Sequence, residues 1–408
     1  MTAAGALQRP RFFVSPKRLN RVESGRSRCA KDDVFVDRIV EAAVINNTEL
    51  QLPFIGARRS KKLRISLRCE MKEILNLDLK NLAYAPEISG LALRGYSGPQ
   101  EHERIAAVIQ RCWDADGVDE VITSDDIARR FTHMQNFDPT QDVLLAEICG
   151  DLVGYVRMNW LHESNGDVIF RHDGYVLPEW RRKGIGSTLL RFTKDHLKGL
   201  ANHAPKEGLR FFEVFVADTE SEKQALLKSA GYQPVRFFFE MVRPLDADIP
   251  EIALPEGLEI RPATPDLYRT IFDAAEEAFQ DHWGHVPATD SEYQGWVKSP
   301  YFQPERWKVA WDNGQVAGMV LNFINDKEND RFNRKRGHTE DISVRRPWRR
   351  RGLARSLLAQ SLQMLKDEGM EEAALGVDTN NPSGALGLYE NLGFQNIKLW
   401  MAYRKPMV

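Results

Sequence analysis

The sequence predicts an α/β protein made of two tandem domains, each with a mixed central sheet covered by helices. Three observations lead to this prediction. Strand-like and helix-like patterns alternate from Leu91 onward. An apolar strand runs through an arginine-rich turn into a helix at 341–354, and again at 174–186. The matching segments keep the same order at an offset of about 160 to 170 residues, which indicates two copies of one domain.

Composition is that of an ordinary globular protein. The chain has 408 residues, 42% hydrophobic content and a formal net charge of -2, which leaves room for two or three domains. No apolar run reaches the length of a membrane span, and the basic N-terminus lacks the apolar segment of a secretory signal. We therefore expect a cytoplasmic protein that does not bind a membrane.

Cysteine usage predicts neither a disulfide framework nor a metal site. The four cysteines are Cys29, Cys69, Cys112 and Cys149, and no pair has CxxC spacing. Reduced and mostly buried thiols are the expectation. Because no cysteine follows residue 149, an acyl-cysteine intermediate in the second copy is disfavoured.

The first seventy residues differ from the rest. Residues 1–70 carry fifteen Lys and Arg against seven Asp and Glu, and they show little periodicity. We interpret them as a basic, disordered N-terminal extension. Two alternatives stay open: translated upstream sequence outside the mature protein, or an extension that touches nucleic acid or a membrane surface.

The two copies match element by element. Each opens with a strand and an amphipathic helix, then a hairpin, a strand entering the arginine-rich turn, a helix, a further strand and a short helix. The paired segments are 91–94 and 258–261, 144–156 and 309–320, 174–186 and 342–354, 211–216 and 373–377, and 225–232 and 386–394. These pairs define an N-terminal domain at 71–243, a proline-containing linker at 244–257 and a C-terminal domain at 258–408.

The second arginine-rich turn is suited to bind a phosphate. The strand ends near Val344, and a helix is expected from Arg355 to Gly369. A helix start exposes free backbone N–H groups and the positive end of the helix dipole. The alternative is a solvated basic patch, for example for nucleic acid.

These motifs resemble the GCN5-related N-acetyltransferase (GNAT) superfamily, over roughly residues 90 to 405. In that family the phosphate-binding stretch reads Gln or Arg, two residues, Gly, one residue, then Gly or Ala. Both 181–186 and 349–354 fit this pattern. The resemblance implies acetyl-CoA as cosubstrate, no metal and no nucleic-acid partner.

The resemblance also implies which residues hold acetyl-CoA. Backbone groups of the turn would hold the pyrophosphate, with Gly352 and Ala354 small enough for close approach, and the arginines would add side-chain charge. The strand end would contact the pantetheine arm and the thioester carbonyl. The expected binding residues are Ile342, Ser343, Val344, Arg349, Arg350, Arg351, Gly352, Leu353, Ala354, Arg355, Asn381 and Ser383, with Arg181, Gly184 and Gly186 in the first copy.

Tyr389 is the expected proton donor to the leaving thiolate, because in the family a tyrosine at this place lies beside the coenzyme sulfur. It would sit on a short helix that starts around Asn381 and Ser383, which flank Pro382. The alternative is a tyrosine that only fills the core. The first copy has Leu227 at the matching position. We therefore expect that copy to be catalytically degenerate, and whether it binds acyl-CoA stays open.

The expected base lies on the strand before the turn. Alternation places His338, Glu340, Ile342 and Val344 on one face. Family members often carry a base four to six positions before this valine, so Glu340 is the first candidate and His338 the second. An ordinary polar strand end is the alternative.

The acceptor pocket is expected at the loop 279–285. Asp281 could pair an ammonium group, and Trp283 could offer a cation–π face, although both could instead fix the loop. The tandem layout resembles mycothiol synthases, which acetylate a cysteinyl pseudodisaccharide, but the layout alone does not specify an acceptor.

The function that follows is an acetyl-CoA-dependent N-acetyltransferase acting by direct attack of a primary amine, on a small molecule or a peptide, with catalysis in the C-terminal domain. The alternative is a non-catalytic, regulatory tandem module that binds acyl-CoA. The sequence leaves the acceptor and the oligomeric state open.

Overall fold

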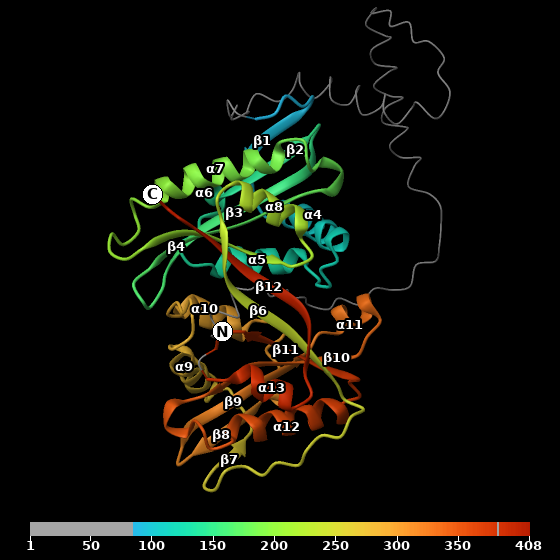
Figure 1. Cartoon of the computed structure of the whole chain (residues 1–408), viewed down its shortest axis with the longest axis vertical. Helices are drawn as coiled ribbons and strands as arrows, with labels where there is room; N and C mark the ends of the chain where they lie inside the picture. The colour runs from blue at the N-terminus through green and yellow to red at the C-terminus, as the bar shows by residue number, and fades with distance from the viewer. Residues whose placement is uncertain (1–84, 382) are drawn as a thin grey trace, which may run out of the picture. The chain divides into compact units, whose positions relative to one another are not determined.

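A computed structural model describes residues 85–381 and 383–408 (Figure 1). We call residues 85–244 the N-terminal half and residues 245–408 the C-terminal half. The interpretation of 1–70 as a basic extension falls outside the described residues.

The N-terminal half follows the predicted order of strands and helices. Its elements are β1 Leu91–Gly95, α4 Glu101–Asp116, α5 Ser124–His133, α6 Pro139–Asp142, β2 Val143–Ile148, β3 Asp151–His162, β4 Val168–Val176, the 3₁₀ turn η1 Pro178–Trp180, α7 Ile185–Leu200, β5 Arg210–Ala217, α8 Ser221–Ser229 and β6 Gln233–Pro244.

The C-terminal half repeats this order. Its elements are β7 Glu259–Arg261, α9 Tyr268–Phe279, α10 Asp290–Val297, η2 Pro304–Arg306, β8 Lys308–Asp312, β9 Gln315–Ile324, α11 Asp326–Phe332, β10 Arg336–Val344, η3 Arg346–Trp348, α12 Leu353–Asp367, β11 Glu372–Asp378, α13 Ala385–Asn391 and β12 Gln395–Pro406.

The strands of both halves join in one sheet, in the order β1-β2-β3-β4-β5-β12-β6-β11-β10-β9-β8-β7. The pairs β4–β5 and β10–β11 are parallel and the others are antiparallel. The prediction of mixed sheets covered by helices is confirmed.

The last strand of each half is exchanged. β12 pairs with β5 of the N-terminal half, from Trp400 opposite Ala217 to Pro406 opposite Phe211. β6 pairs with β11 of the C-terminal half, and β6 and β12 pair with each other. The division of the sheet therefore does not follow the division of the sequence at 244–257, because each half is completed by a strand from the other.

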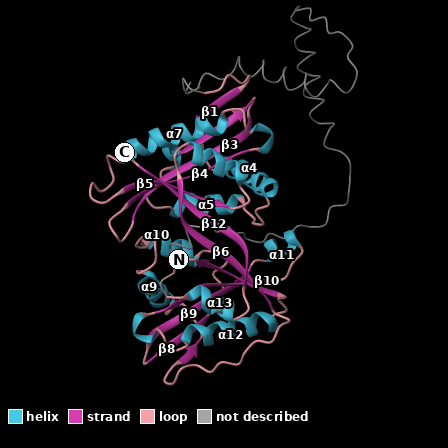
Figure 2. Cartoon of the chain, viewed as in Figure 1, coloured by secondary structure: helices cyan, strands magenta, loops and turns pink. Residues whose placement is uncertain are grey.

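The two faces of the C-terminal sheet carry separate cores. Figure 2 shows the helices and strands that contribute to them. On β9, Val320 belongs to a buried cluster with Leu358 of α12, whereas Met319 and Leu321 belong to a cluster with Phe272 of α9. Neighbouring residues of a strand point to opposite faces, so a sheet buried on both sides needs apolar residues in succession.

Three further observations concern the described residues. None of their helices is both long and apolar enough to cross a membrane. They contain no cluster of three or more His, Cys, Asp or Glu suited to hold a metal ion. Cys112 is a free, buried thiol, and burial raises its pKa to about 11.

Candidate active site

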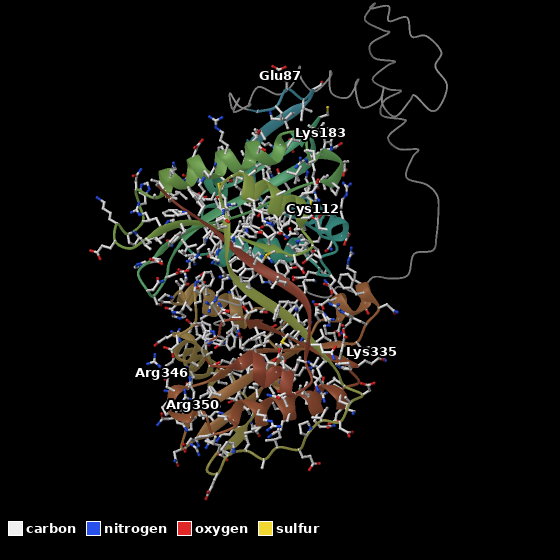
Figure 3. The ribbon with its side chains drawn as sticks, in the orientation of Figure 1. Glu87, Cys112, Lys183, Lys335, Arg346 and Arg350 are labelled. Carbon is white, nitrogen blue, oxygen red and sulfur yellow. The ribbon has the colours of Figure 1, made fainter. Side chains whose placement is uncertain are left out.

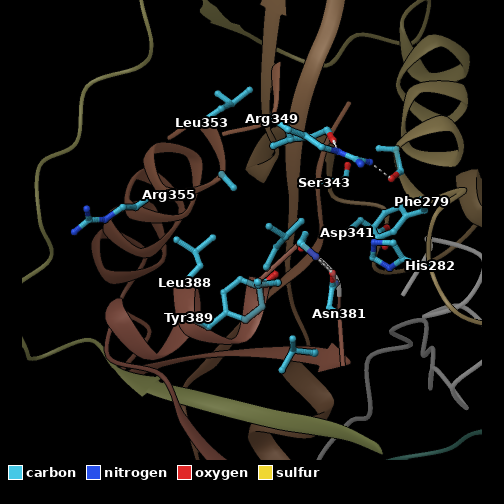
Figure 4. A pocket seen from close by; sticks show the side chains of 18 of the residues that line it. Phe279, His282, Asp341, Ser343, Arg349, Leu353, Arg355, Asn381, Leu388 and Tyr389 are labelled. Atoms are coloured by element: carbon cyan, nitrogen blue, oxygen red, sulfur yellow. Dashed lines mark hydrogen bonds between the residues drawn. The ribbon is translucent and has the colours of Figure 1, made fainter. Parts of the chain in front are cut away.

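A cavity of about 600 Å³ opens where β10 and β11 separate (Figure 4). The two strands pair only from Arg336–Glu372 to His338–Ala374. Thr339 Oγ1 still donates to the carbonyl of Ala374 at 3.2 Å, and beyond this point the strands diverge. The gap gives a ligand access to backbone groups that a continuous sheet would use itself.

One wall of the cavity is the turn before α12. Arg350 has φ 62° and Gly352 has φ 83°, so two left-handed residues fold the chain back onto the helix start. α12 begins without a side-chain cap, whereas α5 and α10 are closed by capping boxes. The first N–H groups of α12 are therefore oriented to bind an anion. A Cβ at Gly352 would meet no atom within 4 Å, which leaves room for a phosphate there.

The signature arginine of the turn has a structural role. Arg349 Nε donates to the carbonyl of Val344 at 2.9 Å, and another of its nitrogens donates to the carbonyl of Ala278. Arg181 repeats the first bond in the N-terminal half, with Nε 3.0 Å from the carbonyl of Val176. The Arg349 guanidinium, which was expected to add charge to the phosphate site, is thus already hydrogen-bonded to a strand end, a helix end and Asp281.

Two other arginines of the turn differ in position. Arg351 does not line the cavity, and it donates to the carbonyl of Glu256 at 3.0 Å. Arg350, which is labelled in Figure 3, is exposed and lines the cavity. Arg355 is also exposed and lines the cavity. These two side chains, Arg350 and Arg355, can supply charge to an anionic ligand.

Asp281 lines the cavity but is engaged by the turn. Its carboxylate accepts hydrogen bonds from Arg346 and from Arg349, the latter at 2.9 Å. These hydrogen bonds hold the pKa of Asp281 well below its ordinary value of 3.8. The predicted pairing of Asp281 with an acceptor ammonium must therefore compete with two arginines.

Acid should remove the contribution of Asp281 to stability. Because its folded pKa is depressed, the stabilisation is complete above the ordinary pKa of 3.8 and is lost as the pH falls toward the folded value. We expect Asp281→Asn to have a slightly lower thermal midpoint than the wild type at pH 7. The difference between the two thermal midpoints should become smaller below about pH 4. Calorimetric scans at pH 7 and pH 3 check this, and an equal gap at both would contradict it.

A β-bulge changes the face on which the predicted residues lie. The β9–β10 register shifts by one residue between Glu340 and Ser343, and Asp341 in between has φ 47°. Glu340 is opposite Leu321 and Ser343 is opposite Met319, so both share the α9 face with His338. Ile342 and Val344 pack on the α12 side. The prediction of one face for all four is wrong, because the extra residue inverts the alternation.

The bulge also affects hydrogen bonding in the cavity wall. Its residues 340–344 all line the cavity. The extra residue leaves backbone groups outside the regular ladder. The Ser343 hydroxyl is buried without a hydrogen-bond partner among the described residues. Unpaired groups at this depth suit a polar ligand.

Tyr389 lies in the cavity wall on α13 (Figure 4). Its side chain is 5% exposed. Burial, with the negative charge of Glu340 as a second cause, raises the pKa of this phenol above its ordinary value. The hydroxyl therefore stays protonated at neutral pH and is able to donate.

The start of α13 differs from the prediction. The helix begins at Ala385 after Gly384, which has φ 76°, and no side chain caps it. The side chain of Asn381 instead accepts a hydrogen bond from the N–H of Ser383 at 2.9 Å. Asn381 and Ser383 both line the cavity, but they form a turn that precedes the helix.

His338, the second candidate base, lies outside the cavity lining. His338 stacks on Phe323 at 4.6 Å, and its Nε2 lies 3.3 Å from Glu328. Burial would raise the pKa of Glu328, but His338 and Arg334 lower it to about 2. The His338 ring is packed between Phe323 and Glu328, away from the cavity, which leaves Glu340 as the cavity-lining candidate base.

Trp283 is used in packing. The guanidinium of Arg404 lies 4.2 Å from its ring centroid, and that of Arg236 lies at 5.8 Å. Phe238 contacts the same ring at 6.1 Å. The cation–π face that was predicted for an acceptor amine is occupied by arginines of the chain itself.

The N-terminal half has a cavity of similar size, about 590 Å³, which Arg181, Gly184 and Gly186 line. Its turn repeats the left-handed pair, with Arg182 at φ 59° and Gly184 at φ 89°. α7 also begins without a side-chain cap. The features that suit a phosphate are therefore present in both halves.

The rest of the N-terminal cavity differs. The β3–β4 register is continuous from Gly154–Val176 to His162–Val168, so β4 has no bulge. Leu227 stands where Tyr389 stands in the second half, and it lines the cavity with His172. His172 is bonded to Tyr232 at 2.9 Å, and burial lowers its pKa to about 3.

Comparisons with known proteins match each half of the chain to a family model. The model of the "Acetyltransferase (GNAT) family" matches residues 268–394, and that of the "Acetyltransferase (GNAT) domain" matches residues 139–234. A mycothiol acetyltransferase of Thermobifida fusca is 33% identical over 245 residues, which cover 55% of this chain and 70% of the relative. This chain belongs to the GNAT acetyltransferase family. It is an acyltransferase with two GNAT domains.

Other relatives and structures agree. A mycothiol acetyltransferase of Salinispora tropica is 27% identical over 302 residues, 73% of this chain and 90% of the relative. A GCN5-related N-acetyltransferase from Sphaerobacter thermophilus aligns with TM-score 0.59 at 25% identity, over 79% of this chain and 96% of that chain. A tandem GNAT protein from the clavulanic acid biosynthesis pathway shares the fold, with TM-score 0.55 at 15% identity over 78% and 98% of the two chains.

Sequence reasoning missed some residues of this GNAT site. Asp341 is the left-handed bulge residue, and Asp378 also lines the cavity. His282 lines it too, within the predicted acceptor loop 279–285. Asp is among the residues that tolerate a left-handed backbone, so a polar residue inside the strand 338–344 was an available signal. For Asp378 the sequence held a weaker signal, because only its position at the end of a predicted strand indicated a site residue.

Proposed function

We propose that this chain transfers an acetyl group from acetyl-CoA to a primary amine, in the cavity of the C-terminal half, by direct attack of the amine. One observation carries the proposal: the uncapped start of α12, the bulge of β10 and the buried Tyr389 border the same cavity. The N-terminal cavity keeps the first feature but has Leu227 and an unbulged strand. This difference supports a catalytic C-terminal half and a degenerate N-terminal half.

Acetyl-CoA fits the wall built by the turn. The N–H groups of residues 350–354 would hold its pyrophosphate, and Arg350 and Arg355 would add charge. Backbone groups of 342–344 would contact the pantetheine arm and the thioester carbonyl. Donors fixed in position before the reaction stabilise negative charge that develops on a carbonyl oxygen.

Glu340 and Tyr389 would handle the protons. Glu340 would take a proton from the acceptor ammonium, directly or through water, so that the neutral amine can attack. The new C–N bond forms as the C–S bond breaks, and the nitrogen releases its second proton to the solvent. Tyr389 would donate its proton to the departing sulfur and recover one from the solvent. The hydroxyl of Tyr389 is protonated at neutral pH and borders the cavity, and these two observations support this role.

The proposed acceptor is the cysteinyl amine of a pseudodisaccharide, which the resemblance to mycothiol synthases implies. The relatives that are named mycothiol acetyltransferases support it, because two of them align over 70% and 90% of their own lengths. More generally, the acceptor class is a small molecule or peptide with a free primary amine.

An acceptor screen tests this proposal. We expect incubation with acetyl-CoA to yield an N-acetyl product from cysteinyl-glucosamine, in preference to glucosamine, spermidine and a lysine peptide, as measured by liquid chromatography and mass spectrometry. If only another amine were acetylated, the acceptor would belong to the class of that amine and would not be a cysteinyl pseudodisaccharide. Acetyl-CoA binding without any acetylated amine would favour the rival function, a regulatory module that only binds acyl-CoA.

A further inference from the structure

Two loops border the C-terminal cavity on either side of the gap between β10 and β11. The loop after α9 contributes Asp281 and His282. The loop after β11 contributes Asn381 and Ser383, next to Asp378 at the strand end. The width of the cavity depends on how these two loops are held.

Arg236 contacts both loops, although it comes from β6 of the N-terminal half. Its Nε donates to Asp378 Oδ1 at 2.8 Å and its Nη2 to Oδ2 at 2.8 Å. The same Nη2 donates to the carbonyl of Asn380 at 3.1 Å. Its guanidinium also faces the ring of Trp283 in the other loop, at 5.8 Å.

The contact concerns the site because Asp378, the partner of Arg236, lines the cavity. Its side chain is 4% exposed, so its carboxylate needs a partner inside the protein. Asp378 Oδ1 also accepts the N–H of Asn380 at 3.0 Å, which orders the backbone leading to Asn381. Only a planar, forked cation can bond both carboxylate oxygens and reach a carbonyl as well.

The loop after α9 is also held from the N-terminal half. The N–H of Ser164 donates to the carbonyl of His285 at 2.8 Å, and the Ser164 hydroxyl lies 2.6 Å from His285 Nδ1. Ser164 is in the β3–β4 turn. The strand exchange thus brings the N-terminal half against the back of both loops.

We propose that Arg236 is a positioning residue for acetyl transfer in the C-terminal cavity, an inference that rests on the proposed function. By tying Asp378 and Trp283 together it fixes the spacing of the two loops, and so the approach of the amine to the thioester. The N-terminal half then contributes to the reaction through a strand and an arginine, without performing chemistry.

Arg236→Lys tests this role because it keeps the charge and removes the fork. We expect kcat/KM to fall at least tenfold, since small misplacements of reacting groups are costly. The substrate for this assay is the amine of the acceptor panel that the wild type acetylates fastest. The acetyl-CoA dissociation constant should change by a smaller factor than kcat/KM, because the turn before α12 that would hold the pyrophosphate does not contact Arg236, although Asn381 and Ser383 are in the loosened loop. Hydrogen exchange at 280–285 and 379–384 should become about tenfold faster.

Arg331→Lys is the matched control. Arg331 also joins the two halves, through bonds of 2.7 Å to Asp114, but it does not line the cavity. We expect its kcat/KM and loop exchange to stay within twofold of the wild type. If Arg236→Lys does not fold, the double variant Arg236→Gln with Asp378→Asn removes the ion pair without leaving a buried charge, and the same losses are expected.

Unchanged exchange in both loops would overturn the inference whatever the catalytic result. So would an unchanged kcat/KM, a matching loss in Arg331→Lys, or an equal fall in acetyl-CoA affinity and kcat/KM. A wild type that acetylates no amine would instead refute the proposed function, and the exchange measurement would still decide whether Arg236 holds the loops.

Discussion

Replacing Tyr389 by Phe should lower kcat at least 100-fold and leave the acetyl-CoA dissociation constant within about twofold of the wild type. The change removes one oxygen from a side chain that is 5% exposed and keeps the ring against Phe394. Because the phenol is neutral at physiological pH, its loss removes a proton donor and no charge. Steady-state kinetics and calorimetry measure the two quantities.

Tyr232→Phe is the matched control for this prediction. It removes the same atom from the N-terminal half, where the hydroxyl is bonded to His172. We expect a small loss of stability, about 1 kcal/mol for one buried hydrogen bond, and nearly normal turnover. Near-normal turnover in Tyr389→Phe, or a large loss in Tyr232→Phe, would refute Tyr389 as the acid.

Gly352→Glu should abolish measurable acetyl-CoA binding in the C-terminal half. A Cβ at this position meets no protein atom within 4 Å, so the substitution begins in open space. It instead places a carboxylate at the proposed pyrophosphate site, where like charges repel.

Gly352→Ala separates charge from strain. Both variants carry the cost of a left-handed backbone at φ 83°, about 1 to 2 kcal/mol for a residue with a Cβ. We expect Ala to weaken binding a few-fold and Glu at least 100-fold. Calorimetric titration with acetyl-CoA measures both, and equal affinities for the two variants would contradict a phosphate at this site.

Local spacing in the sequence was enough to predict the main parts of the fold and of the cavity. The turns at 181–186 and 349–354, the strand before each and the short helix with Tyr389 are short-range features, and the structure has them in the expected order. Nine of the ten expected coenzyme residues of 342–355, all except Arg351, border one cavity together with Asn381, Ser383, Glu340 and Tyr389.

Features that depend on distant partners were not predictable in this way. The bulge at Asp341 is defined by the register against β9, so alternation along one strand could not reveal it. Arg349 was expected to contact phosphate, but its partners lie on α9 and at the end of β10. His338 was a candidate base, but its pairing with Glu328 depends on where α11 folds back.

The strand exchange is the largest such case. A repeat of similar segments predicts two separate units, and the order of elements is the same whether the last strands are exchanged or not. Only the pairing of β6 with β11 and of β12 with β5 distinguishes them. That pairing brings Arg236 beside Asp378, 142 residues away in the sequence.

The most direct test of catalysis in the C-terminal half compares acetyl transfer by Gly352→Glu and Gly184→Glu. Both variants put a carboxylate at a left-handed glycine before an uncapped helix, one in each half. We expect Gly352→Glu to form no acetylated amine and Gly184→Glu to retain most of the wild-type rate, with folding checked by thermal midpoints. Loss of product in Gly184→Glu together with retained product in Gly352→Glu would contradict the assignment.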